Sequence, residues 1–198
     1  QVFGATVSAM TANGAKGAVV TVPSIVNLPY FTTVPYNAIP LNQATADLVN
    51  GGYAAYNGGL QQVYAGLVLQ GLPQEVADEE LAKRTIVFTA GQNAVVIVDE
   101  DLRDLTGFGL PNYRQATAED FLVLTSSSFL GTTVGGNPLL INGVSVPLAD
   151  NWVLTPEEQN NIQTAINAYN ATIVSVGNAS GLAVIDLNDL LNEAASTG

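Results

Sequence analysis

The residue types that most enzymes use for acid–base and nucleophilic chemistry are missing from this chain. None of its 198 residues is a histidine and none is a cysteine. Histidine is the usual general base near neutral pH, and cysteine is the side chain that attacks most readily without activation. The sequence therefore cannot by itself build a Ser-His-Asp or Cys-His site, or a zinc or iron site with imidazole or thiolate ligands. We expect no cofactor and no metal.

Serines and carboxylates are the remaining candidates for chemistry. The cluster Ser126-Ser127-Ser128 follows the apolar residues 121–125, which predict a strand. The G-x-S-x-G turn that exposes a nucleophilic serine is absent, so we interpret these serines as structural or solvent-facing. The acidic residues 99–104 lack the glycine and the terminal glutamate of a calcium loop, and we expect a solvated helix start there. We identify no catalytic, substrate-binding or metal-ligating residue.

Composition limits the class of protein further. Hydrophobic residues make up 47% of the chain and charged residues 11%, which indicates a globular protein rather than a disordered one. The net charge of −12 argues against binding to nucleic acid or to anionic lipid, because both need lysine and arginine. No apolar run approaches the roughly 20 residues of a membrane helix, so we expect no transmembrane segment.

Two similar helix–turn–strand units are predicted near the two ends of the chain. Residues 5–13 are typical of the end of a helix that stops at Asn13-Gly14, and the apolar residues 16–22 then predict a buried strand. A second helix begins around Thr155-Pro156, and the apolar strand 182–187 follows it after a turn. Strands that are each entered from a helix are typical of a parallel sheet, so we expect these two to be parallel neighbours.

The middle of the chain predicts different structure, and we interpret residues 41–150 as an insertion. Residues 43–70 have helical spacing, although two glycine pairs at 51–52 and 58–59 predict breaks or close packing. A short acidic helix is expected after Pro73. Residues 85–90 and 93–100, separated by Gly91-Gln92, predict a β-hairpin or two adjacent short strands.

Residues 23–40 contain four prolines and predict an ordered loop rather than a helix or a central strand. This loop follows the carboxyl end of a predicted buried strand, which is where ligands bind in open α/β sheets. Two interpretations stay open. The loop either packs its aromatic side chains on the domain for structural reasons, or forms part of a substrate cleft wall together with the helix at 43–70.

Three segments carry a resemblance to a known family. Residues 12–41 (ANGAKGAVVTVPSIVNLPYFTTVPYNAIPL), residues 88–106 (FTAGQNAVVIVDEDLRDLT), and the pair 153–173 and 181–191 (VLTPEEQNNIQTAINAYNATI and GLAVIDLNDLL) resemble the interior of SGNH (GDSL-type) hydrolase-like envelope proteins of Bacteroidetes-type bacteria. The resemblance spans nearly the whole chain. It implies an α/β fold, a three-layer flavodoxin-like (SGNH-type) parallel sheet carrying a helical and β-hairpin insertion, with residues 1–198 forming part of one such domain.

The catalytic blocks of that family have no counterpart in this sequence. The family's nucleophile lies in a Gly-Asp-Ser block, and its acid and base lie in an Asp-x-x-His block. The nearest echo here, Asp150-Asn151-Trp152-Val153, has valine where the histidine would stand. No catalytic residue is therefore carried over to this chain.

The resemblance implies that the chain is an interior segment of a carboxylic ester hydrolase, lipase- or esterase-like, whose catalytic residues lie outside it. The alternative is a non-catalytic cell-surface binding or assembly protein on the same scaffold. In both cases we expect a bacterial cell-envelope or secreted location. We also expect an open sheet edge that is covered by the remaining polypeptide of the same protein or by another protein chain.

Overall fold

The computed structural model describes residues 2–197, apart from the side chains of Asn27, Ala195 and Thr197. The chain divides into two compact units. Residues 1–28 together with 157–198 form the first, which we call the flanking unit. Residues 29–156 form the second, the central unit. The insertion expected over 41–150 falls inside the central unit.

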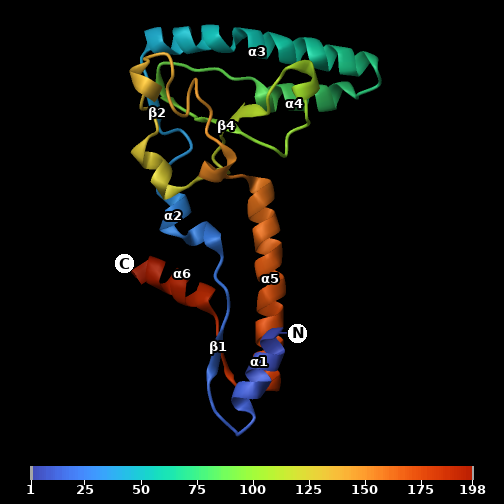
Figure 1. Ribbon diagram of the computed structural model, residues 1–198, viewed down its shortest axis with the longest axis vertical. Helices are drawn as coiled ribbons and strands as arrows, with labels where there is room; N and C mark the ends of the chain where they lie inside the picture. The colour runs from blue at the N-terminus through green and yellow to red at the C-terminus, as the bar shows by residue number, and fades with distance from the viewer. Residues whose placement is uncertain (1, 198) are drawn as a thin grey trace. The chain divides into compact units, whose positions relative to one another are not determined.

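The flanking unit contains the two helix–turn–strand units that the sequence predicts (Figure 1). In each of them a helix is followed by a glycine with a positive φ angle, Gly14 at 76° and Gly181 at 63°, and then by a short strand. A side chain at either position would strain the backbone, so glycine allows the tight reversal from helix to strand. The elements of this unit are α1 (Val2–Thr11), β1 (Ala18–Val20), η1 (Ile25–Asn27), α5 (Pro156–Ala179), β8 (Ala183–Ile185) and α6 (Leu187–Thr197).

Strands β1 and β8 pair in parallel, with Val19 opposite Val184, which confirms the predicted pairing. Helix α5 packs on this pair very closely at Gly177. A Cβ atom at that position would lie 2.6 Å from a methyl group of Val19 and 3.0 Å from one of Val184. The structure thus mixes helices and strands around a small parallel sheet and belongs broadly to the α/β class.

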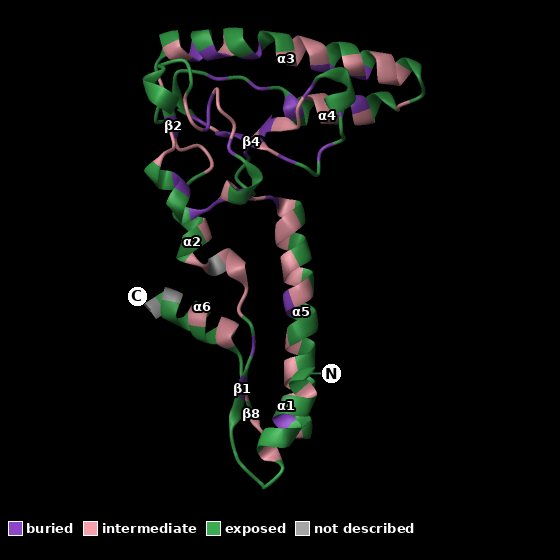
Figure 2. Ribbon diagram, viewed as in Figure 1, coloured by how far each residue is buried: buried purple, intermediate pink, exposed green. Residues whose placement is uncertain are grey.

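The opposite face of the β1–β8 pair is open, in contrast to the expectation of strands covered on both faces. Val19 is buried, but Val20 is 47% exposed and Ile185 is 39% exposed (Figure 2). Within residues 2–197 no third strand pairs with β1 or β8. Parallel sheets normally have both faces covered, so the exposure of Val20 and Ile185 is unusual for a parallel pair.

The central unit combines two long helices with three antiparallel strand pairs. The pairs are β2 with β3, β4 with β5, and β6 with β7. Helix α3 is the longest element, and within residues 2–197 no helix combines the length and apolarity needed to cross a lipid bilayer. The elements are α2 (Pro29–Thr32), β2 (Ile39–Leu41), α3 (Gln43–Leu69), α4 (Gln74–Arg84), β3 (Gly91–Asn93), β4 (Val96–Val98), η2 (Thr106–Phe108), β5 (Tyr113–Gln115), β6 (Phe121–Leu122), η3 (Leu124–Ser128), η4 (Val134–Gly136), η5 (Asp150–Trp152) and β7 (Val153–Leu154).

Helix α3 confirms the helix predicted over residues 43–70, but it runs without a break through both glycine pairs. Close packing explains one of the four glycines. A Cβ atom at Gly59 would lie 2.8 Å from a methyl group of Leu110. At Gly51, Gly52 and Gly58 a Cβ atom would meet open space. The helix tolerates these three glycines because other residues of α3, such as Val49 and Leu60, pack its buried face into the core.

The predicted β-hairpin of residues 85–90 with 93–100 is wrong, and of the alternative pair of short strands only the second forms, as β4. Strand β3 pairs with β2, β4 pairs with β5, and residues 85–89 belong to no strand. For residues 86 and 88, side-chain amides of α3 make the backbone hydrogen bonds that a neighbouring strand would otherwise make. Asn50 accepts from the Phe88 N–H and donates to its carbonyl, both at 2.8 Å. Asn57 does the same for Ile86, at 3.1 and 2.8 Å. Because these asparagines are seven residues apart, they lie on one face of the helix and match alternate residues of an extended segment.

Two smaller expectations also need correction. Residues 23–40 are not entirely loop, because they include η1, the four-residue helix α2 and the start of β2. Pro40 is tolerated in β2 because this strand lies in a two-stranded pair, where proline need not donate on its outer edge. The strand predicted over 121–125 is limited to β6, and η3 follows at once.

The acidic residues 99–104 do not begin a solvated helix, because Asp99 is buried against Arg114. The Arg114 guanidinium also makes a two-pronged contact with Asp120, at 2.6 and 2.7 Å. Burial acts to lower the pKa of Arg114. Hydrogen bonds to Asp120 and Asp99 outweigh burial and raise that pKa. The buried cation is thus fully paired, as a stable buried charge requires.

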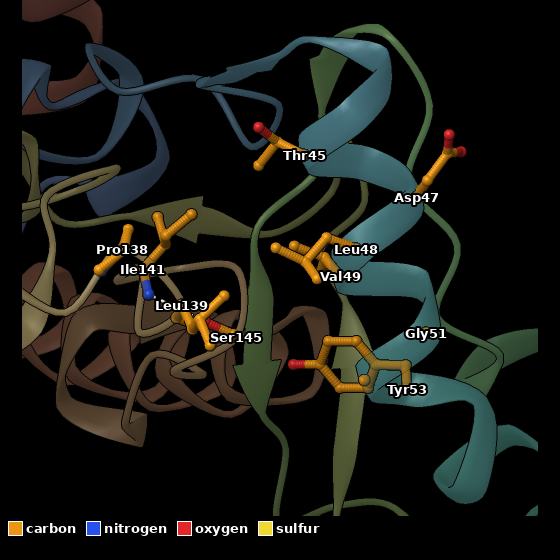
Figure 3. Close-up of a pocket in the computed structure, with 11 residues that line it drawn as sticks. Thr45, Asp47, Leu48, Val49, Gly51, Tyr53, Pro138, Leu139, Ile141 and Ser145 are labelled. Carbon is orange, nitrogen blue, oxygen red and sulfur yellow. Dashed lines mark hydrogen bonds between the residues drawn. The ribbon is translucent and has the colours of Figure 1, made fainter.

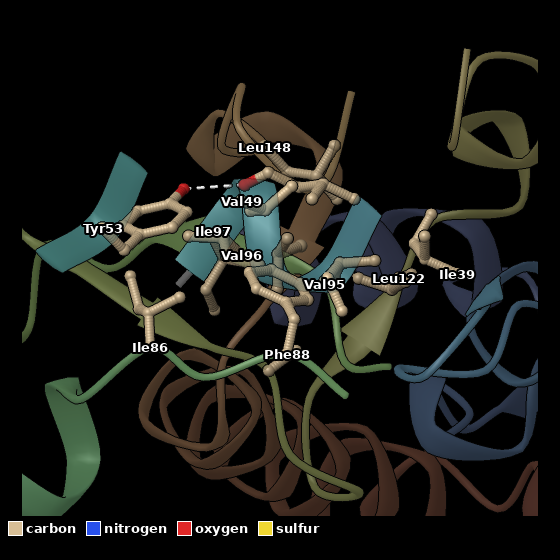
Figure 4. Close-up of a cluster of buried hydrophobic side chains, with 14 of the residues drawn as sticks. Ile39, Val49, Tyr53, Ile86, Phe88, Val95, Val96, Ile97, Leu122 and Leu148 are labelled. Carbon is tan, nitrogen blue, oxygen red and sulfur yellow. Dashed lines mark hydrogen bonds between the residues drawn. The ribbon is translucent and has the colours of Figure 1, made fainter. Parts of the chain in front are cut away.

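The main hydrophobic core lies in the central unit, between α3 and the strands (Figure 4). Ile86 and Phe88 enter it from the extended segment that the two asparagines hold. Tyr53 enters it from α3, and its hydroxyl donates to the carbonyl of Val144 at 2.6 Å. A second cluster between α3, α4 and the loop near Leu110 includes Leu60 and Tyr64.

Replacing Asn57 with alanine should destabilise the central unit by about 2–4 kcal/mol. The change leaves the N–H and C=O of the fully buried Ile86 without partners, and each unpaired buried group costs ~1–3 kcal/mol. Gln62→Ala, at an exposed position of the same helix, is the matched control and should change stability by less than ~0.5 kcal/mol. Urea unfolding followed by circular dichroism measures both. Equal stabilities of the two variants would contradict the role assigned to Asn57.

Candidate functional site

The carboxyl ends of β1 and β8 carry a group of polar side chains, at the place where α/β sheets usually bind ligands. The hydroxyl of Thr21, directly after β1, donates to the carboxylate of Asp186, directly after β8, at 3.1 Å. The same hydroxyl accepts from the N–H of Leu187 at 2.9 Å. This contact ties the two strand ends together and fixes the first turn of α6.

The residues that follow β1 are held in the same way. Asn188 accepts from the Ser24 N–H at 2.6 Å, and the Ser24 hydroxyl bonds to Gln163 of α5 at 2.9 Å. Asn170 of α5 both accepts from and donates to the backbone of Val22, at 2.7 and 2.9 Å. The polar groups at these strand ends are therefore bonded mainly to one another. They orient the chain, and they do not form a nucleophile with an adjacent base.

The serine cluster after β6, which we interpreted as structural or solvent-facing, lies in the short helix η3. Ser126 is completely buried, while the hydroxyls of Ser127 and Ser128 donate to carbonyls three residues earlier in the same short helix. Such bonds are typical of serine in a tight turn and leave no activated oxygen.

A cavity of about 570 Å³ lies between α3 and the loop at residues 138–145 (Figure 3). The helix contributes Leu48, Val49 and Tyr53, and the loop contributes Leu139 and Ile141. Helix α3 is the predicted helix of residues 43–70 that we considered as part of a cleft wall. The loop side was not predicted, although the run Pro138-Leu139-Leu140-Ile141 in a glycine-rich stretch was a signal for it.

A second, smaller groove lies in the flanking unit between α1 and β1. Its volume is about 330 Å³, and its lining includes Phe3, Val7 and Met10 of α1 together with Ala18 and Val20 of β1. Met10 is 72% exposed. The groove includes all three residues of β1, and within residues 2–197 no strand other than β8 pairs with β1.

Three tyrosines of α3, Tyr53, Tyr56 and Tyr64, have raised pKa values. Burial raises the pKa of Tyr53 above its ordinary value of 10.0. Burial also raises the pKa of Tyr56, although the nearby Arg84 partly offsets it. Burial and a hydrogen bond to Glu80 raise the pKa of Tyr64 to about 12. These hydroxyls therefore stay neutral at physiological pH.

Comparisons with known proteins found no match. No family model matches the sequence, and no significant match was found among curated proteins or solved structures. The resemblance drawn from the sequence segments therefore remains a proposal.

The stability of the central unit should fall as the pH rises from about 10 toward 12. The unfolded state loses its tyrosine protons near pH 10, while the folded state keeps them, so stability is complete below pH ~10 and is lost above it. Urea unfolding at several alkaline pH values tests this. Tyr64→Phe should make the decline shallower, because it removes one of the shifted groups. A stability that stays constant across this range would contradict the assignment.

Proposed function

We propose that this chain is the scaffold portion of an SGNH-type carboxylic ester hydrolase, with the catalytic residues supplied by polypeptide outside residues 1–198. The observation that carries the proposal is the parallel β1–β8 pair, in which each strand is entered from a helix through a glycine turn. This is the repeating unit of a parallel α/β sheet.

The positions of the helices indicate where the rest of a three-layer sheet would lie. Helix α5 packs on Val19 and Val184, and α1 lies against α5, since a Cβ atom at Gly4 would be 3.8 Å from Val176. Both helices therefore cover the same face. Crossovers between parallel strands are almost always right-handed. A strand that precedes α1 would then lie on the edge of β1 opposite β8, in the groove between α1 and β1.

The backbone of β1 supports this placement. The Ala183 N–H donates to the Gly17 carbonyl at 3.1 Å, and the Thr21 N–H donates to the Ile185 carbonyl at 3.0 Å. Alternate residues of a strand direct their backbone groups to opposite edges, so those of Ala18 and Val20 point away from β8. A further strand would satisfy these groups. It would come from the remaining polypeptide of the same protein or from another chain.

The proposed reaction assigns the missing chemistry to that polypeptide. A serine would attack the acyl carbonyl, with a histidine as its base and an aspartate orienting the histidine. Esters of lipids or of acylated glycans would be the substrates, in a bacterial cell envelope or outside the cell. Because this chain contains no histidine, its own contribution would be the sheet and a wall of the substrate cleft.

One observation favours the alternative of a non-catalytic binding or assembly protein on the same scaffold. The hydroxyls of Ser24 and Ser127 are bonded to structural partners rather than to a base, and the β1 edge offers apolar surface with free backbone groups. A protein that had lost the chemistry would keep these features and could use the edge to bind another chain.

Labelling with a fluorophosphonate separates the two functions. We expect the protein purified from its cells, together with any associated chains, to be labelled at one serine outside residues 1–198. The heat-denatured protein is the control and should not react. Residues 1–198 alone should not hydrolyse p-nitrophenyl acetate above a heat-killed control. The absence of any labelled serine would favour the binding function, and a label within residues 1–198 would overturn the assignment of catalysis to other polypeptide.

Amide exchange tests the proposed strand at the β1 edge. In residues 1–198 alone, the amides of Ala18 and Val20 should exchange at least about tenfold faster than in the protein purified from cells, because only the latter supplies a partner strand. The amides of Thr21 and Ala183, which donate to carbonyls across the β1–β8 pair, are the internal controls and should be protected in both. Equal protection of Ala18 and Val20 in the two samples would contradict a missing strand.

A further inference from the structure

We propose that the cavity between α3 and residues 138–145 binds a neutral aliphatic chain. Its identification as the acyl chain of an ester rests on the proposed function, whereas the binding itself does not. The volume of about 570 Å³ lies within the range of roughly 300–1,000 Å³ that small-molecule sites occupy.

The helical wall of the cavity is built from one stripe of α3. Thr45, Leu48, Val49, Gly52 and Tyr53 follow helical spacing and line the cavity together. Val49 and Tyr53 are 6% and 8% exposed and form its floor, while Leu48 at the rim is 56% exposed. At Gly52 the helix presents no side chain, and a Cβ atom there would meet nothing within 4 Å. This leaves room for a ligand directly over the helix.

The opposite wall is the loop, whose aliphatic side chains face the helix (Figure 3). Leu139 is 54% exposed, so a bound chain would cover apolar surface on both walls. The backbone of this loop is bonded within itself, with the Leu140 N–H donating to Asn137 at 3.0 Å and the Val144 N–H donating to Ile141 at 3.0 Å. It therefore offers no strand edge to an extended peptide, which favours a simple aliphatic ligand.

The polar groups of the cavity point to an uncharged ligand. The Tyr53 hydroxyl donates to the Val144 carbonyl, and the Ser145 hydroxyl donates to Leu139 while accepting from the Ile141 N–H. Asp47 is the one charged residue of the lining, and it points away from the loop and accepts from Gln43 (Figure 3). No lysine or arginine lines the cavity, so a fatty-acid carboxylate would meet only the negative field of Asp47.

Titration of residues 1–198 with decanol, followed by methyl NMR, tests the proposal. Decanol should cause saturable shifts in the methyl signals of Leu48, Val49, Leu139 and Ile141. Decanoate should bind about tenfold or more weakly at a pH where it is ionised, because the site supplies no cation. The absence of saturable shifts at these residues would overturn the proposal, and so would equal affinities for decanol and decanoate.

Two glycine variants provide a matched pair. Gly52→Leu should fill the cavity and weaken decanol binding about tenfold or more, whereas Gly58→Leu, outside the cavity, should leave it unchanged. At both positions a new Cβ atom meets open space, and both changes favour the helix by a similar amount, about 1 kcal/mol. Equal effects of the two variants would overturn the site. Decanol binding in a protein with no labelled serine would keep the site but remove its identity as an acyl subsite.

Discussion

The central unit depends on the bonds that Asn50 and Asn57 make with an extended segment of backbone. Their amides act as a strand partner for Phe88 and Ile86, with one donor and one acceptor to each residue. Between them, the Val87 N–H donates to the side-chain carbonyl of Gln115 at 3.0 Å. Buried backbone must be hydrogen-bonded, so these contacts allow two large apolar side chains to enter the core without a neighbouring strand. The packing of α3 against the strands follows from that arrangement.

Structure that depends on patterns repeating along the chain was predicted well. Structure that depends on contacts of single side chains was not. The apolar runs after Gly14 and before Leu187 correctly indicated two parallel strands, because helix, turn and strand each left a local signal. The hairpin failed because alternating apolar residues specify an extended chain but not what it pairs with. The missed signal was an asparagine pair on the apolar stripe of a helix, where an amide must find a partner.

The candidate site was predicted only in part for a similar reason. Helical spacing identified one wall of the α3 cavity, because periodic residues share a face. The other wall belongs to a loop, whose course is set by turns and side-chain bonds such as that of Ser145 to Leu139. Composition was more informative about chemistry, since the lack of histidine and cysteine excluded a Ser-His-Asp or Cys-His site built from these residues alone before any fold was known.

Helix α5 can pack as close to the β1–β8 pair as it does only because Gly177 has no side chain. The methyl groups of Val19 and Val184 occupy the space that a Cβ atom would need. Alanine at this position would improve the intrinsic preference for helix by about 1 kcal/mol and at the same time push the helix layer off the strand layer. Local preference and interlayer spacing therefore oppose each other at this residue. The same spacing sets how closely Gln163 and Asn170 of α5 approach the backbone and side chains of Val22 and Ser24, to which they are bonded.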